Sequence, residues 1–242
     1  MSDLFAEHHA VARLRAERLA RCTKPFAARG SRAERCPRCR VIAGYCLCAW
    51  RPRVETRAGM CLLMYDLEAV KPSNTGWLIA DVVRDTSAFC WSRTEQDPNL
   101  LALLADPAWQ PYVVFPGEYA APERVVSEVR VEAGRRPLFI LLDATWPEAR
   151  KMFRKSPYLN HLPVLSMSPE RLSRYRLRRS KRDEHLCTSE VAALCLELAG
   201  EPRAARALDA YLDVFVQHYL SAKRRLPLDL EDETHQRLRE FL

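Results

Sequence analysis

The sequence predicts an α/β domain, with a mostly parallel sheet covered by helices and a small cysteine-rich segment near the N-terminus. From about residue 59 onward, apolar runs of strand length alternate with helical patterns, which is typical of a parallel sheet with helical crossovers. Four cysteines fall within 13 residues, from position 36 to position 48. The chain has seven glycines and no glycine-rich phosphate motif, which argues against a dinucleotide-binding fingerprint.

Composition narrows the class of protein. A length of 242 residues and 48% hydrophobic content suit one domain with a sizeable core and a small appendage. The apolar runs are much shorter than the roughly 20 residues of a membrane span, and the N-terminus lacks a signal-peptide apolar region. We therefore expect a cytoplasmic protein without membrane contact. A net charge of +7 favours a polyanionic partner.

The N-terminal part is expected to form a unit of its own over residues 1–52, followed by a main domain over residues 53–242. Leu4, Val11, Leu14 and Leu19 have the spacing of an amphipathic helix that docks on a larger body. A frayed basic arm is the alternative for this first stretch.

The cysteine cluster predicts a metal site. Cys36 and Cys39 form a C-x-x-C knuckle, and Cys46 and Cys48 form a C-x-C pair. Four such thiolates can surround a tetrahedral Zn²⁺ at about 2.3 Å each. The second pair is tighter than in the usual zinc ribbon, so Cys22 is an alternative ligand. Since the surroundings are Arg, Gly and Pro rather than a helix start, a redox C-x-x-C is disfavoured. We predict a closed structural zinc site that helps a small segment to fold.

The remaining elements follow in order. Strands are expected at residues 59–65, 87–91, 112–117, 138–142 and 163–167. Helices are expected at 77–83, capped by Asn74 or Thr75; at 99–105; from Pro147; from Thr188 or Ser189 as cap to Gly200; and over 204–225. Residues 229–242 give no clear prediction.

The run from Leu138 to Leu142 organises the chain. Five large apolar residues indicate a strand buried on both faces. Asp143 follows at its carboxyl end, which in open α/β sheets faces the ligand crevice. The equal alternative is that Asp143 or Thr145 only caps the helix that begins at Pro147.

Two loops are further site candidates. Residues 68–75 form a polar loop after the first predicted strand, and loops on a rigid scaffold often carry function; a solvated turn is equally compatible. Pro116 and Gly117 permit a sharp turn with close backbone approach to a ligand, although such a pair is more often a plain turn.

Seven cations within residues 171–182 could contact successive phosphates, and the interleaved Tyr175 could stack on a base. A solvated charged face is the alternative to nucleic-acid contact.

Taken in order, the motifs resemble those of the DTW-domain family, the tRNA-uridine aminocarboxypropyltransferases, over about residues 36 to 220. The motifs are the four cysteines; Glu68 with the run from Lys71 to Thr75; Phe115-Pro116-Gly117; Asp143-Ala144-Thr145-Trp146; Tyr175-Arg176-Leu177-Arg178; and Cys187-Thr188-Ser189-Glu190. Two positions depart from the family pattern: Ala144 replaces the usual Gly, and Tyr65-Asp66 stands where His-Pro is common. Ala144 keeps a small residue, which suffices unless the position needs a positive φ.

The resemblance implies a fold similar to the SPOUT class, with a trefoil knot towards the C-terminus. It also implies transfer of the 3-amino-3-carboxypropyl group of S-adenosylmethionine to N3 of a uridine in tRNA, which leaves methylthioadenosine. The implied partners are tRNA and S-adenosylmethionine, and we expect a monomer rather than a homodimer. The alternatives are a zinc-containing RNA-binding protein without catalysis and a SPOUT-like RNA methyltransferase.

The resemblance also implies residue roles. Asp143 is the first candidate for the general base that takes the N3 proton, or for a group that aligns the uridine and steadies the sulfonium. Glu190 is the second catalytic candidate, although it could serve only in a capping arrangement. Cofactor contacts are expected from Phe115, Pro116, Gly117, Asp143, Thr145, Trp146, Leu165, Ser166, Thr188 and Ser189. Substrate contacts are expected from Glu68, Asn74, Thr75, Arg174, Tyr175, Arg176, Arg178, Arg179, Lys181 and Arg182.

Overall fold

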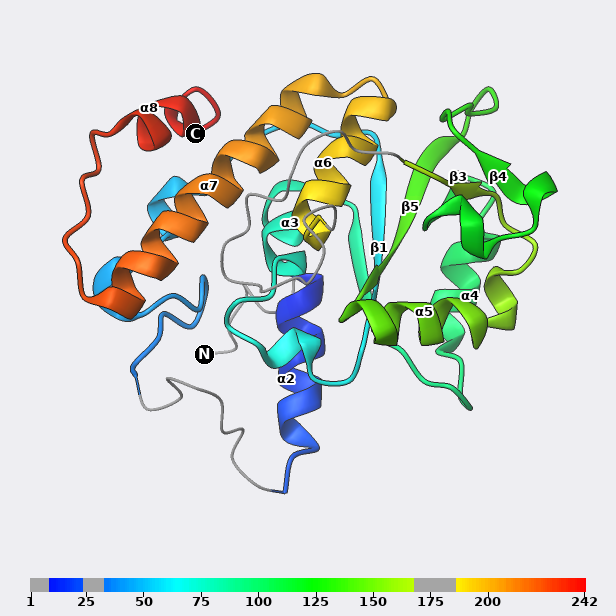
Figure 1. Cartoon of the computed structure of the whole chain (residues 1–242), viewed down its shortest axis with the longest axis horizontal. Helices are drawn as coiled ribbons and strands as arrows, with labels where there is room; N and C mark the ends of the chain where they lie inside the picture. The colour runs from blue at the N-terminus through cyan, green and yellow to red at the C-terminus, as the bar shows by residue number, and fades with distance from the viewer. Residues whose placement is uncertain (1–8, 24–32, 168–185) are drawn as a thin grey trace.

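The computed structural model describes residues 9–23, 33–167 and 186–242 (Figure 1). Its centre is a six-stranded sheet in the order β2-β1-β5-β3-β6-β4, in which every pair of neighbours is parallel. The strands are β1 (Gly59–Met64), β2 (Thr86–Cys90), β3 (Trp109–Val114), β4 (Val125–Val126), β5 (Arg136–Asp143) and β6 (Val164–Leu165). The predicted α/β class with a parallel sheet is confirmed.

The neighbouring strands β1 and β5 are buried on both faces, as their apolar runs predict. In β1, the side chains of Met60 and Leu62 enter one core cluster, whereas Cys61 and Leu63 enter the cluster on the opposite face. β5 lies between β1 and β3, with Asp143 in register with Met64. This pairing aligns the carboxyl ends of β1 and β5 at one edge of the sheet.

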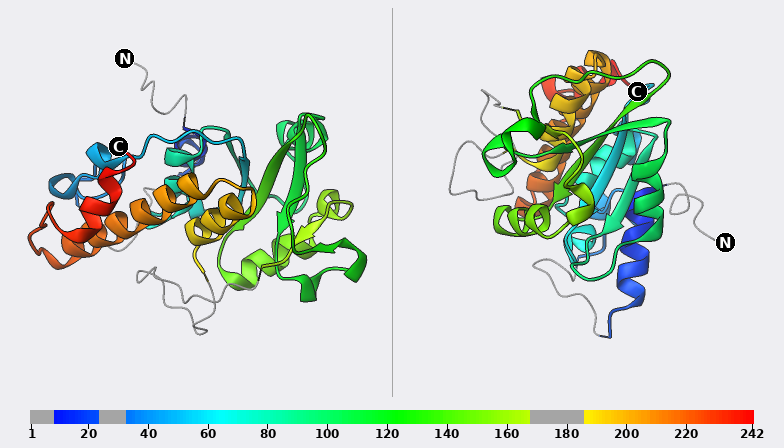
Figure 2. Two further views of the ribbon diagram at one scale, coloured as in Figure 1. Left: turned by 90° about the horizontal axis from the view of Figure 1, so that it is seen from above. Right: turned by 90° about the vertical axis from the view of Figure 1, so that its right-hand side faces the viewer.

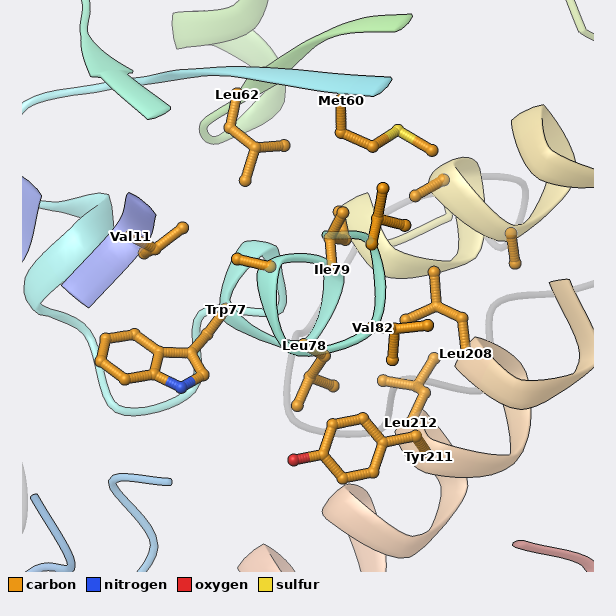
Figure 3. Close-up of a cluster of buried hydrophobic side chains, with 14 of the residues drawn as sticks. Val11, Met60, Leu62, Trp77, Leu78, Ile79, Val82, Leu208, Tyr211 and Leu212 are labelled. Carbon is orange, nitrogen blue, oxygen red and sulfur yellow. The ribbon is translucent and has the colours of Figure 1, made fainter. Parts of the chain in front are cut away.

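Four helices cover the first face: α2 (Ala10–Ala20), α3 (Gly76–Val82), α6 (Thr188–Leu198) and α7 (Pro202–Arg224). Figure 3 shows α3 lying between the sheet and α7. Met60 and Leu62 of β1 lie above α3, whereas Tyr211 and Leu212 of α7 lie below it and Leu208 lies to its right, all within the same buried cluster. Since α3 begins at the carboxyl edge of the sheet, this packing also fixes the loop before it.

The opposite face is covered by α4 (Pro98–Ala105) and α5 (Trp146–Arg154), which contribute Leu100, Ala149, Met152 and Phe153 to the second cluster. Figure 2 shows α6 and α7 on one side of the sheet and α5 on the other. The result is a three-layer arrangement, with helices on both faces of the sheet.

The cysteine-rich segment packs against the C-terminal helices. It contains two short 3₁₀ turns, η1 (Ala43–Tyr45) and η2 (Cys48–Trp50). Leu47 is fully buried in the same cluster as α7, and the Trp50 ring lies 4.5 Å from that of His235 in α8 (Glu233–Arg239). The expected division at residue 52 stays a prediction.

Some elements differ from expectation. β4 and α8 were not predicted, and β6 is shorter than the predicted strand. The cap of α6 was predicted wrongly as Thr188 or Ser189. The capping residue is Cys187, because the helix already begins at Thr188 and Cys187 has extended backbone with φ −76° and ψ 164°.

Residues 1–8, including Leu4, and residues 168–185, between β6 and α6, lie outside the described residues. The predicted trefoil knot therefore stays a prediction. Among the described helices, none has both the length and the apolar character needed to span a membrane.

Candidate functional site

Asp143 ends β5 and is fully buried. Asn74 Nδ2 donates to its Oδ2 at 2.6 Å, and the Thr188 hydroxyl donates to its Oδ1 at 2.6 Å. Burying a carboxyl group costs free energy unless it is hydrogen-bonded. The two donors therefore offset the cost of burying Asp143. The carboxylate thereby joins three segments that are distant in the sequence: the end of β5, the loop before α3 and the first residue of α6.

The loop before α3 is built to present Asn74. Its side-chain Oδ1 accepts a hydrogen bond from the Trp77 backbone N–H at 3.3 Å, which leaves Nδ2 directed at Asp143. Gly76 makes the approach possible, because a Cβ there would lie 2.8 Å from Asp143 Oδ2. The start of α3 therefore needs glycine for space and Asn74 for orientation.

The start of α6 contacts the same loop. The Ser189 backbone N–H donates to the Thr75 hydroxyl at 3.4 Å, and both side chains are fully buried. The structure thus brings together five predicted site residues on the α3 and α6 side of the sheet. They are Asp143, Asn74, Thr75, Thr188 and Ser189.

Glu190 has a local structural partner. Its fully buried carboxylate accepts from the backbone N–H of Cys187 at 2.8 Å, completing a capping box at the start of α6. The Cys187 thiol is also buried, and burial together with the charge of Glu190 raises its pKa to about 12. Glu190 therefore performs the capping role that the sequence left open for it.

Glu68 lies in the turn η3 (Glu68–Val70), almost fully buried. Its carboxylate is 2.5 Å from the half-buried Lys71 Nζ, in an i,i+3 ion pair within the loop. The predicted substrate contact by Glu68 is not tested by this geometry. The ion pair shows that its negative charge already has a partner inside the loop.

A second group of predicted residues lies at the carboxyl ends of β3 and β6. The Gly117 N–H donates to Ser166 Oγ at 3.0 Å. A Cβ at Gly117 would lie 2.9 Å from Val125 Cγ1 and 3.2 Å from Ser166 Oγ. The Pro116-Gly117 turn therefore packs closely against Ser166, while the expected backbone approach to a ligand stays a prediction.

The first turn of α5 forms an aromatic wall beside this second group. The Trp146 ring stacks on Phe115, with centroids 5.4 Å apart and an interplanar angle of 13°. Thr145 is the cap of α5, and its backbone N–H donates to the Glu148 carboxylate at 2.9 Å. Capping thus belongs to Thr145, while Asp143 is held by residues of other segments.

The remaining predicted substrate contacts lie outside the described residues. They are Arg174, Tyr175, Arg176, Arg178, Arg179, Lys181 and Arg182.

The four predicted zinc ligands converge. The Sγ atoms of Cys36, Cys39, Cys46 and Cys48 all lie within 4.8 Å of one another. The separations are 3.6 Å for Cys36–Cys48, 3.7 Å for Cys36–Cys46 and 3.9 Å for Cys39–Cys46. Tetrahedral Zn²⁺ with bonds of about 2.3 Å requires sulfur–sulfur separations of about 3.8 Å. The cluster could therefore hold a metal ion and is compatible with zinc.

The alternative ligand Cys22 is not part of this cluster. Its thiol accepts from Arg18 Nη1 at 3.0 Å, just beyond the end of α2. Within the cluster, the neighbouring Cys48 thiol lowers the pKa of Cys39. A thiol that ionises readily is suited to metal ligation.

Sequence reasoning missed two residues at the site, Gly76 and Arg40. Gly76 follows the polar loop at the first position of α3, where a glycine is otherwise unfavourable, and that position was its only signal. Arg40 follows Cys39 and donates through Nη1 to the Lys71 carbonyl at 2.7 Å. No sequence pattern predicts so long a reach from the cysteine segment to the loop.

These features define an α/β protein with a polar site at the carboxyl ends of a parallel sheet and a four-cysteine cluster suited to a metal ion. A model of the DTW domain matches residues 33–220, so the chain belongs to the DTW-domain family. The predicted family is thus confirmed.

Among curated proteins, the chain is similar to tRNA-uridine aminocarboxypropyltransferase 2 of Drosophila melanogaster, with 26% identity over 175 residues. The match covers 69% of this chain and 66% of that protein, so it spans just under two thirds of the relative's length. No solved structure matches the chain.

Ala144 is the position at which the chain departs from the family's naming motif. Its backbone does not have a positive φ, unlike that of Arg40 or Arg225. The turn after β5 therefore accepts alanine without the conformation that would require glycine.

Proposed function

We propose that this protein transfers the 3-amino-3-carboxypropyl group of S-adenosylmethionine to N3 of a uridine in tRNA. The family membership and the name of the Drosophila relative support a transferase that acts on tRNA uridine. The observation that carries the proposal is the buried Asp143 at the carboxyl end of β5, held by Asn74 and Thr188. In open α/β sheets this edge is where ligands bind.

The transfer forms a bond between uridine N3 and the methionine side-chain carbon next to sulfur. The bond from that carbon to sulfur breaks, and its electron pair stays on sulfur in methylthioadenosine. The N3 proton must pass to a base, because neutral uridine N3 is a poor nucleophile. The protein has to hold the carbon and N3 in line, at near-attack distance.

Asp143 is proposed as the central polar group of this site. Both of its oxygens already accept short hydrogen bonds from the protein, which favours an orienting and charge-stabilising role. To act as the base, Asp143 would have to exchange the Thr188 hydroxyl for the uridine imide. Glu190 is proposed to act through the helix start, where it accepts from the Cys187 N–H.

The donor is proposed to lie against two turns at the strand ends. One contains Gly76 and lies beside the start of α6, and the other contains Gly117 and lies beside Ser166. Ser189 Oγ is buried and has no hydrogen-bond partner among the residues that the structure describes, so a polar group of the donor can satisfy it. The missing side chain at Gly117 lets this turn pack against Val125 and Ser166, and the donor is proposed to lie beside the turn. Phe115, Pro116, Leu165, Thr145 and Trp146 would complete the walls.

The tRNA is proposed to contact the outer face of α5 as well as the cationic run between residues 174 and 182. Arg150, Lys151, Arg154 and Lys155 are all exposed on or just after α5. The Arg150 guanidinium lies 4.9 Å from the Tyr119 ring centroid, and Lys151 Nζ lies 5.6 Å from that of Tyr65. Cations next to part-exposed aromatic rings suit phosphates and unstacked bases.

The four-cysteine cluster is proposed to bind a structural Zn²⁺, because its sulfur separations match a tetrahedral ion. Four protein ligands leave no coordination position for a substrate. We further propose that residues 1–52 form the zinc-containing appendage of the main domain.

The test is to incubate the protein with S-adenosylmethionine and tRNA and to identify both products by mass spectrometry. The proposal predicts methylthioadenosine and an aminocarboxypropyl-modified uridine, formed only when tRNA is present. S-adenosylhomocysteine with a methylated nucleoside would instead identify a methyltransferase. Binding of tRNA with steep salt dependence, but with neither product, would identify an RNA-binding protein without catalysis.

A further inference from the structure

Arg40 connects the cysteine cluster to the loop that presents Asn74. It directly follows Cys39, yet its side chain is almost fully buried. Its Nη1 donates to the Lys71 carbonyl at 2.7 Å and its Nη2 to the Asn74 carbonyl at 3.2 Å. Its guanidinium carbon lies 3.8 Å from the centroid of the Trp77 ring, in a cation–π contact. One side chain thus holds both ends of the segment from Lys71 to Asn74 and the first turn of α3.

The position of this side chain depends on the fold of the cysteine knuckle. The Arg40 backbone has φ 64°, in the left-handed region that residues with a Cβ rarely adopt. Two hydrogen bonds hold the turn: Arg40 N–H to the Cys36 carbonyl, and Cys36 N–H to the Val41 carbonyl, both at 2.9 Å. Because Cys36 and Cys39 belong to the cluster suited to a metal, an ion bound there would pin both sides of this turn.

The loop in turn depends on Arg40. The Asn74 backbone carbonyl receives the guanidinium, while the Asn74 side chain donates to Asp143 Oδ2. Asn74 is fully buried. If its backbone shifted, water could not replace the hydrogen bonds that it would lose. The contacts therefore form a continuous path from the cluster through Arg40 and Asn74 to Asp143.

We propose that Arg40 is a positioning residue through which a metal ion in the four-cysteine cluster orders the Lys71–Asn74 loop and so sets the Asn74–Asp143 hydrogen bond. The cluster then has a role beyond folding its own segment. This inference goes beyond the proposed function, because it concerns order in the loop and holds whatever reaction the site performs.

Hydrogen exchange of the full-length protein, followed by mass spectrometry, tests this coupling. Peptides over residues 71–78 report the loop, since the backbone N–H groups of Asn74 and Leu78 donate within it. Removal of the metal by a chelator should speed exchange in these peptides by about tenfold or more, while peptides from β1 and β5 change little. An unchanged loop after removal of the metal would overturn the proposal.

The variant Arg40→Met removes the donors but keeps a long apolar side chain. With metal bound, residues 71–78 of this variant should exchange hydrogen as fast as those of the metal-free wild type. Removal of the metal from the variant should then raise this exchange rate little further. The matched control is Arg51→Met, whose arginine donates to the Asp81 carbonyl at 3.0 Å near the other end of α3. This control should retain wild-type exchange in residues 71–78 and a wild-type response to metal removal.

A fast loop that speeds up further on metal removal in Arg40→Met would contradict the proposal, because the metal would then act by another path. If hydrogen exchange in Arg40→Met is fast throughout the protein, the milder Arg40→Lys variant replaces it. Lysine keeps the positive charge but lacks the paired N–H donors of the guanidinium. Arg40→Lys should loosen residues 71–78 alone, and wild-type protection there would contradict the proposal. Coupling without any aminocarboxypropyl transfer would refute the proposed function and leave this inference intact.

Discussion

Asp143 and Glu190 are two fully buried carboxylates at neighbouring ends of β5 and α6, and they differ in where their partners come from. Glu190 accepts from the backbone N–H of Cys187, three residues away in its own helix start. Asp143 accepts from the side chains of Asn74 and Thr188, which are 69 and 45 residues away. The first carboxylate thus has a capping partner within its own helix start. The partners of the second carboxylate come from two distant segments that meet at the carboxyl edge of the sheet. Burial alone therefore does not distinguish the two acids, whereas the origin of their partners does.

The largest effect is expected from Asp143→Asn. The substitution removes the charge and turns an acceptor into an amide that cannot accept from both Asn74 and Thr188. Transfer of the aminocarboxypropyl group should fall by about 100-fold or more, the range lost when a general acid–base or charge-stabilising group is removed. The measurement is the initial rate of methylthioadenosine formation, with thermal unfolding as the control for folding. A folded variant whose transfer rate is within about threefold of wild type would contradict the claim that Asp143, unlike Glu190, supports the reaction.

Thr188→Val tests whether the partners of Asp143 matter. Valine has nearly the same shape but cannot donate to Asp143 Oδ1, so the buried oxygen loses one hydrogen bond. We expect a loss in the free energy of unfolding of about 1–3 kcal/mol and a drop in transfer of about tenfold. Thr188→Ser keeps the hydroxyl and serves as the matched control. Equal rates for the Val and Ser variants would show that this hydrogen bond does not support the reaction.

Glu190→Gln should have a much smaller effect. A glutamine carbonyl can still accept from the Cys187 N–H in a capping box. Transfer should remain within about threefold of wild type, and the free energy of unfolding should change by less than about 1 kcal/mol. Both are measured by the same assays as above. A folded Glu190→Gln protein without transfer would instead place Glu190 in the chemistry.

The smallest effect concerns pH at the start of α6. Because burial and Glu190 raise the pKa of Cys187 to about 12, the folded protein keeps this thiol protonated where the unfolded chain ionises it near 9.0. Its contribution to stability is complete below about pH 9 and is lost as the pH rises towards about 12. Urea unfolding across this range should show falling stability. Cys187→Ser should weaken the fall, although buried Cys61 and Cys195 also have raised pKa values. An identical slope in the variant would exclude Cys187 as a cause.

Much of the fold and part of the site could be predicted, because their signals are local. The apolar run from Leu138 to Leu142 encodes a strand buried on both faces, and the rule for ligand sites in α/β sheets then places Asp143 at the carboxyl edge. The spacing of Cys36, Cys39, Cys46 and Cys48 similarly encodes their convergence, since four thiols close in sequence need only a turn to meet.

The missed features depend on tertiary contact. Arg40 reaches the Lys71 and Asn74 carbonyls across more than 30 positions, and Gly76 is required by the close approach of Asp143.

Two further features were missed because their local signals are weak. The cap at Cys187 was missed because cysteine is not among the usual capping residues. Helix α8 lacks an apolar stripe, as only His235 and Leu238 of its seven residues are buried.

The most direct test of the account is a single measurement on two variants. Asp143→Asn and Glu190→Gln would be incubated side by side with S-adenosylmethionine and tRNA, and the modified uridine would be quantified by mass spectrometry of the digested tRNA. The account predicts abundant modified uridine with Glu190→Gln and almost none with Asp143→Asn, both proteins being folded. Comparable amounts from the two variants, or the reverse order, would contradict it.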